Sequence, residues 1–207
     1  MPSILPHAVP TSISQPVARA VSRTGLTPNQ VTAIGFLLNA IAAVLVGYGQ
    51  FVAGALVMLL GGVLDLIDGA LARLTRRATP FGSVFDAVMD RYAEGVILFG
   101  LLIWELNHGR SVEPALIFAT VVGSFLVSYT RARSEVIRMD VKDGLFTRAE
   151  RVALLAVALI LARVPFVLVG SLWVLAVFTN LTALQRLYYV WTRTKDLAPT
   201  AETESGA

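Results

Sequence analysis

Four aspartates between positions 65 and 90 carry the clearest chemical signal in this sequence. Asp65 and Asp68 are three residues apart, and Asp86 and Asp90 are four apart. Each spacing places its pair on one face of a helix. If the four carboxylates converge near a membrane, they need a cation, and carboxylate oxygens suit Mg²⁺, Mn²⁺ or Ca²⁺. Two such ions would favour phosphoryl transfer, because they stabilise charge on the transferring and leaving phosphates.

The residues beside these acids fit a phosphate ligand. Gly69 follows Asp65 by four residues and Gly82 precedes Asp86 by four, so both glycines lie on the carboxylate faces. A missing side chain there leaves room for a diphosphate. Arg73, one turn after Gly69, can pair with a phosphate. The alternative is that both glycines only allow close helix packing.

Two other interpretations of the acids remain. The carboxylates could be solvated helix ends that form salt bridges with Arg73, Arg76, Arg77 and Arg91. The chain could also be an ion or proton transporter, but transport predicts acids spread across the bilayer depth. Acids inside a membrane are usually functional, and here they cluster at one side.

Composition predicts a membrane protein. The 207 residues are 56% hydrophobic and 15% charged, with a mean hydropathy of +0.70, whereas soluble domains carry about 25% charged residues. There is no cysteine, so thiolate metal sites are excluded, and His7 and His108 are distant from the acids in sequence. We expect membrane lipids as surroundings and no nucleic-acid partner.

Hydrophobic runs predict an all-α integral membrane protein with six transmembrane helices. Thr27, Pro28 and Gln30 give the first helix an N-cap, a first-turn proline and a capping-box residue, and Thr79-Pro80 opens the third. We expect residues 27–195 to form the membrane domain and residues 196–207 a disordered tail. The spans are expected at about 27–46, 51–73, 79–106, 114–129, 151–162 and 166–187, the last ending before Thr192.

Residues 1–26 are predicted to contain an amphipathic helix that lies on the membrane surface. Ile13, Val17 and Val21 recur every four residues, with Arg19 and Arg23 nearby. This pattern is typical of an interfacial helix. The alternative is a soluble cap helix.

The basic residues predict the orientation. With six spans and a cytoplasmic N-terminus, 15 of the 17 Lys and Arg residues fall at the cytoplasmic side, and only Arg110 and Arg163 fall opposite. By the positive-inside rule, both termini and the aspartates face the cytoplasm of a multi-pass cell-membrane protein.

The acidic segment resembles the signature of the CDP-alcohol phosphotransferase family. That signature reads D-x-x-D-G-x-x-A-R, eight residues, then G-x-x-x-D-x-x-x-D, and the chain matches every spacing from Asp65 to Asp90. The resemblance implies two Mg²⁺ ions, with Mn²⁺ as an alternative, held by Asp65, Asp68 and Asp86 with help from Asp90. It further implies that Asp90 deprotonates an acceptor hydroxyl, that CMP leaves, and that the protein is a homodimer.

The same resemblance implies a binding site for CDP-diacylglycerol or CDP-archaeol. The residues that it assigns to this CDP-lipid site are Asn29, Gln30, Val31, Thr32, Gly69, Arg73 and Thr79.

The acceptor alcohol is expected to carry a phosphate. Arg131, Arg133, Arg148 and Arg151 gather between the fourth and fifth spans, and Arg186 can face the same cavity. Such arginines suit bidentate phosphate binding, although lipid headgroups could also attract them.

The stretch from Ser128 to Arg151 resembles the phosphatidylinositol-phosphate synthase branch and its archaetidylinositol-phosphate counterpart. That resemblance implies an inositol phosphate acceptor. Glycerol 3-phosphate is the alternative acceptor, and serine or free inositol ranks lower. The acceptor residues that it implies are Ser128, Arg131, Arg148, Arg151 and Arg186.

Overall fold

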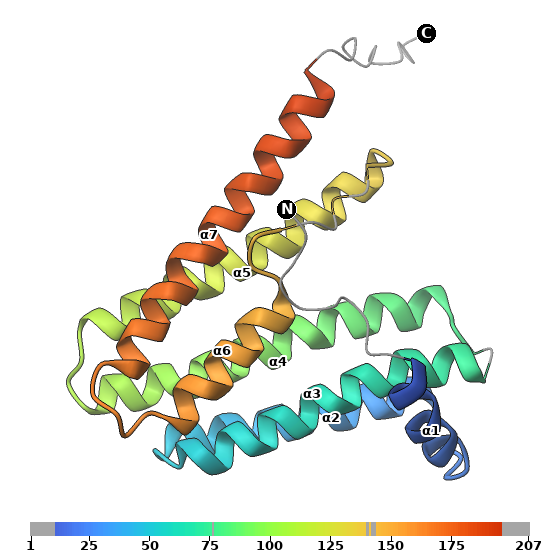
Figure 1. The fold of residues 1–207 in the computed structure, drawn as a ribbon, viewed down its shortest axis with the longest axis horizontal. Coiled ribbons are helices and arrows are strands. Elements are labelled where there is room, and N and C mark those ends of the chain that lie inside the picture. The colour runs from blue at the N-terminus through green and yellow to red at the C-terminus, as the bar shows by residue number, and fades with distance from the viewer. Residues whose placement is uncertain (1–10, 76, 140, 142–143, 196–207) are drawn as a thin grey trace, which may run out of the picture.

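The computed structural model describes residues 11–75, 77–139, 141 and 144–195. The predicted tail at 196–207 and the first ten residues of the predicted interfacial segment lie outside these ranges. Within them the chain forms seven α-helices and no strand (Figure 1). The helices are α1 (Thr11–Ser22), α2 (Pro28–Gly47), α3 (Phe51–Leu74), α4 (Pro80–Asn107), α5 (Val112–Val136), α6 (Arg148–Ile160) and α7 (Val167–Thr194).

Helices α2 to α7 run alternately up and down, so the short turns at 48–50, 108–111 and 161–166 gather at one end of the bundle (Figure 1). Most of the fully buried apolar side chains lie toward that end. They include Val46 of α2, Leu101 of α4, Ile117 of α5, Leu159 of α6 and Leu172 of α7. The four aspartates at 65, 68, 86 and 90 lie in the opposite half of the bundle.

Helices α3 and α4 have few direct contacts with each other. The extensive contacts of both helices are with α2, which lies along the two of them, while α6 packs on α3 and α5 packs on α4 and α7. The two helices run antiparallel (Figure 1) but do not pack tightly. Space is therefore left between their polar ends.

Capping fixes where the helices begin. Thr27 accepts a hydrogen bond from the Gln30 amide, and the Gln30 side chain accepts one from the Thr27 amide, so the predicted capping box is confirmed. Thr79 caps α4 as expected. A second capping box, formed by Thr147 and Glu150, starts α6 and was not predicted.

Three helix limits differ from the sequence expectation. The fourth predicted span ended near Tyr129, but α5 continues to Val136, and an ion pair between Arg131 and Glu135 stabilises its extra turns. Helix α6 begins at Arg148 because of the unpredicted cap. Helix α7 continues to Thr194 rather than ending before Thr192. A prediction from hydrophobic runs identifies the apolar part of each helix. It does not include the polar turns that extend the helix beyond that part.

The chain is a multi-pass membrane protein. Among the described residues, α2, α3, α5 and α7 are long and apolar enough to cross a membrane. Large apolar side chains such as Leu37, Val44, Phe99 and Phe118 lie exposed on the outside of the bundle, as lipid contact requires. Helix α4 carries several acids, and α6 has only 13 residues. Helix α1 packs against α3 and buries Ala18.

Candidate active site

The four predicted aspartates come from the facing polar parts of α3 and α4. Asp65 and Asp68 lie in the second half of α3, and Asp86 and Asp90 lie in the first three turns of α4. Asp65 interacts electrostatically with each of the other three. The structure therefore brings the four carboxylates into one region.

A cation from α6 lies between two of these acids. Arg148 donates from Nη2 to Asp65 Oδ2 at 2.8 Å, and its Nη1 lies 2.9 Å from Asp90 Oδ1. Arg91 lies 3.5 Å from Asp90 as well. The buried Nε of Arg148 has no hydrogen-bond partner among the described residues. A buried N–H without a partner leaves this guanidinium incompletely satisfied.

Asp68 and Asp86 have no ion pair within the described part of the chain. Asp68 is 4% exposed and accepts a hydrogen bond of 2.6 Å from the Thr32 hydroxyl of α2. A buried carboxylate beside other carboxylates needs a positive charge. The donor chemistry of this region therefore fits a divalent cation. Within the described ranges, however, no three acidic or histidine side chains already surround one point.

A polar pocket of about 240 Å³ opens between α2, α3, the 75–79 turn and the start of α4. Five of the seven residues expected to contact the CDP-lipid line it: Asn29, Thr32, Gly69, Arg73 and Thr79. The other two do not. Gln30 caps α2, and Val31 is packed in the interior. Asp68, Gly82 and Asp86 complete the polar wall.

Gly82 leaves necessary room in this polar pocket. A Cβ at position 82 would lie 3.1 Å from both Asn29 Oδ1 and Thr79 Oγ1, which is tighter than an ordinary contact. A Cβ at Gly69 would meet only Arg73 Nη1, at an ordinary 3.6 Å. Of the two glycines beside the acids, Gly82 therefore has the stronger steric reason to lack a side chain.

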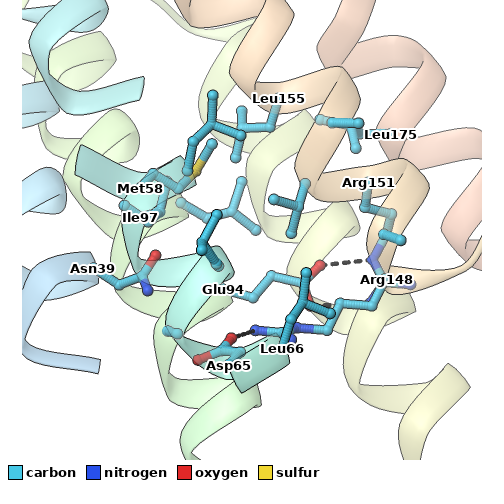
Figure 2. Close-up of a pocket in the computed structure, with 18 of the residues that line it drawn as sticks. Asn39, Met58, Asp65, Leu66, Glu94, Ile97, Arg148, Arg151, Leu155 and Leu175 are labelled. Atoms are coloured by element: carbon cyan, nitrogen blue, oxygen red, sulfur yellow. Dashed lines mark hydrogen bonds and ion pairs between the residues drawn. The ribbon is translucent and has the colours of Figure 1, made fainter. Parts of the chain in front are cut away.

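An apolar pocket of about 410 Å³ lies on the other side of the carboxylates, between α3, α4 and α6 (Figure 2). Met58, Ile97 and Leu155 line its depth, while Asp65 and Arg148 stand at its polar edge. Asp65 thus borders the apolar pocket, while Asp68 and Asp86 border the polar one. An amphiphilic ligand with a phosphate at its junction matches this arrangement.

The arginines expected to bind the acceptor differ in their surroundings. Arg148 reaches the carboxylates. Arg151 is 3% exposed and forms a two-pronged pair with Glu94, at 2.6 Å and 2.9 Å. Arg186 is buried and donates to the Val127 carbonyl. Arg131 is half-exposed and pairs with Glu135.

Ser128, the remaining predicted acceptor residue, is half-buried on α5. Its neighbour in sequence, Val127, is the residue whose carbonyl accepts from Arg186. This contact joins α5 to α7.

Sequence reasoning missed two residues that shape the site. Glu94 lies one helical turn after Asp90, so its i+4 spacing could have placed it on the same face. Gly35 of α2 faces Asp65, where a Cβ would lie 2.9 Å from Asp65 Oδ1. No local pattern identifies Gly35, because the reason for it is a contact between two helices.

Comparison with known proteins places this geometry in a family. Residues 25–187 match the family described as CDP-alcohol phosphatidyltransferase. The phosphatidylinositol phosphate synthase of Mycobacterium tuberculosis is 36% identical over 197 residues, covering 91% of this chain and 90% of that protein. The archaetidylinositol phosphate synthase of Pyrococcus horikoshii is 31% identical over 180 residues, covering 85% and 91%.

Solved structures agree with the sequence matches. The M. tuberculosis phosphatidylinositol phosphate synthase with CDP-DAG bound superposes with a TM-score of 0.80 at 34% identity, covering 87% of this chain and 94% of that one. The same enzyme in complex with manganese and citrate also gives 0.80 at 34% identity, covering 87% and 90%. With its paired aspartates, its six helices after α1 and these matches, the chain belongs to the CDP-alcohol phosphatidyltransferase family.

Proposed function

We propose that this enzyme transfers a phosphatidyl group, or its archaeol equivalent, from a CDP-lipid to a hydroxyl of inositol phosphate. The hydroxyl oxygen bonds to the phosphorus that carries the lipid, the bond to the neighbouring phosphate breaks, and CMP leaves. The observation that carries this proposal is that Asp65 borders an apolar pocket and Asp68 and Asp86 border a polar one, with Arg148 beside Asp65 and Asp90.

Two divalent ions, Mg²⁺ or Mn²⁺, would be held by Asp65, Asp68, Asp86 and Asp90. The shortage of positive charge around Asp68 and Asp86 supports this assignment, and a 34% identical relative was solved with manganese. When bound, the ions would offset the negative charge of the diphosphate. Arg148 contributes a fixed positive charge to the same region.

The polar pocket would hold the nucleotide and diphosphate of the CDP-lipid. Asn29, Thr32 and Thr79 offer polar side chains. Arg73 offers a guanidinium for a phosphate, and Gly69 has no side chain that would fill the pocket. Gln30 and Val31 would act indirectly by fixing the first turn of α2. The apolar pocket has the chemistry required for a hydrocarbon chain.

The acceptor phosphate would bind Arg148, whose side chain is 32% exposed and lines the edge of the apolar pocket. Arg148 also contacts Asp90 at 2.9 Å, so a small polyol held by its phosphate would place a hydroxyl near that carboxylate. This proximity supports Asp90 as the group that accepts the hydroxyl proton. Ser128, Arg131, Arg151 and Arg186 complete the proposed acceptor site, with Arg151 acting from its pair with Glu94.

We also propose that α2 to α7 all cross the membrane, with both termini and the site cytoplasmic. Helix α4 is about 42 Å long at 1.5 Å per residue, enough to cross while keeping its acidic turns near the surface. Helix α1 would lie at the interface, although the side chains of Ile13 and Val17 are outside the described set. The homodimer remains a prediction.

The decisive experiment offers the purified protein CDP-diacylglycerol with a panel of alcohols and measures CMP release. Inositol phosphate should give the highest rate, with glycerol 3-phosphate, free inositol and serine well below it. A chelator should abolish the reaction, and added Mg²⁺ or Mn²⁺ should restore it. Preference for an unphosphorylated alcohol would refute the phosphate-binding role of the arginines.

A further inference from the structure

Glu94 and Arg151 form an ion pair where α4, α5 and α6 meet. Arg151 donates from Nε to Glu94 Oε1 at 2.6 Å and from Nη2 to Glu94 Oε2 at 2.9 Å (Figure 2). The same Nη2 donates to the Ser124 hydroxyl of α5 at 3.0 Å, and Nη1 donates to the Phe146 carbonyl just before α6. Each nitrogen of this guanidinium therefore has a partner.

The pair is well shielded from solvent. The Arg151 side chain is 4% exposed and the Glu94 side chain 10%. Neither charge is stable alone in such a position, because a buried ion loses its hydration and requires a matched partner. The pair therefore ties the first turn of α6 to α4.

Arg148 lies three residues before Arg151, on the same face of α6. Its Nη1 and Nη2 face Asp90 and Asp65, and its Nε is unpartnered among the described residues. The two arginines thus have the same chemistry and different availability. Glu94 is the acid that makes this difference, because it occupies Arg151 and leaves Arg148 to point at the carboxylates.

We propose that Glu94 is a positioning residue for the acceptor. Through Arg151 it fixes the start of α6, so that Arg148 projects between Asp65 and Asp90, where its partly exposed side chain can meet a phosphate oxygen. This inference rests on the proposed function, since it assigns a role toward the acceptor phosphate. It adds a residue that does not itself touch either substrate.

The test substitutes Glu94→Gln and measures CMP release as a function of each substrate. The amide keeps the shape but turns an NH₂ donor toward a guanidinium that has only donors, which loosens Arg151 and with it Arg148. The KM for inositol phosphate should rise roughly tenfold or more. The KM for CDP-diacylglycerol should stay within about twofold of the parent value. Isothermal titration with inositol phosphate should show the same loss of affinity.

Three further variants separate positioning from simple stabilisation. Glu113→Gln is the matched control, because Glu113 pairs with Arg110 at the other end of the bundle and should leave both KM values unchanged. The double variant that combines Glu94→Gln with Arg151→Gln should have an acceptor KM no higher than that of the more impaired single variant. The reason is that the two residues act as one unit. Ser124→Ala should give a smaller rise in the same KM.

The outcomes are distinct. Suppose that Glu94→Gln lowers the fraction of active enzyme and the melting temperature but changes neither KM. That result would overturn the positioning role while the proposed function stands. If Glu94→Gln does not fold, the Ser124→Ala variant decides. A lower melting temperature with an unchanged KM for inositol phosphate would overturn the positioning role as well. A parent enzyme that neither binds nor uses inositol phosphate would overturn the proposed function and this inference together.

Discussion

Gly35→Ala should leave the fold intact and damage the metal site. The added Cβ would lie 2.9 Å from Asp65 Oδ1, 3.4 Å from the Gly61 carbonyl and 3.6 Å from Leu64 Cβ. Only the first separation is shorter than an ordinary contact, which begins near 3.4 Å. The Asp65 carboxylate must therefore retreat by about 0.5 Å, the difference between the two distances. It can do so by side-chain rotation while the helices stay in place.

The effects on stability and activity should have opposite signs. Alanine is the better helix former by about 1 kcal/mol, so the melting temperature should hold or rise slightly. The moved carboxylate, however, already accepts a 2.8 Å hydrogen bond from Arg148 and cannot keep that geometry. Disturbing the surroundings of a metal ligand typically lowers affinity or activity by about 10–100-fold. We expect a loss of that size in CMP release at low metal concentration.

The assay titrates Mg²⁺ and Mn²⁺ against initial rate and records thermal unfolding in the same detergent. Gly170→Ala is the matched control, because a Cβ at Gly170 in α7 meets nothing within 4 Å. If Gly35→Ala and Gly170→Ala have the same metal dependence and the same rate, the steric reasoning for Gly35 is wrong. If Gly35→Ala unfolds, the assumption that Asp65 can rotate freely is wrong.

Three further predictions concern the other site residues. Asp90→Asn should abolish turnover while CDP-lipid binding stays within about threefold, as measured by equilibrium binding of a radiolabelled CDP-lipid; parent-like rates would remove Asp90 from the mechanism. Gly82→Val should raise the KM for CDP-lipid at least about tenfold, because the new side chain would crowd Asn29 and Thr79, and an unchanged KM would show that the polar pocket is not the nucleotide site. Asp68→Asn should raise the metal concentration for half-maximal rate about 10–100-fold, and an identical metal titration would exclude Asp68 as a ligand.

Much of the fold follows from local sequence signals. Thr27 with Gln30, and Thr79 with Pro80, predict two helix starts to the residue because a cap uses only neighbouring atoms. Helix ends were less predictable. The last turns of α5 are polar, and an ion pair between Arg131 and Glu135 stabilises them rather than lipid contact. Hydrophobicity therefore placed the helices correctly and underestimated their length.

The candidate site was predictable where its residues share a helix and unpredictable where they do not. The spacings of Asp65 with Asp68 and of Asp86 with Asp90 required no knowledge of packing. The position of α2 between α3 and α4 depends on side-chain fit across helices. For that reason the Thr32 hydrogen bond to Asp68 came from the structure rather than from the sequence pattern.

The shortness of α6 has a consequence for the surrounding lipid. Its 13 residues extend about 20 Å, against about 30 Å of hydrocarbon in an average bilayer. The turn after it exposes Leu161, Val164 and Phe166, and its backbone bonds internally, with Leu161 donating to Val157 and Val164 to Leu161. Arg163 lies in this turn and its charge must reach the headgroup layer, so the leaflet would thin around the turn. If α6 crosses the membrane as we propose, a thicker bilayer would strain its other end at Arg148, and turnover would depend on bilayer thickness.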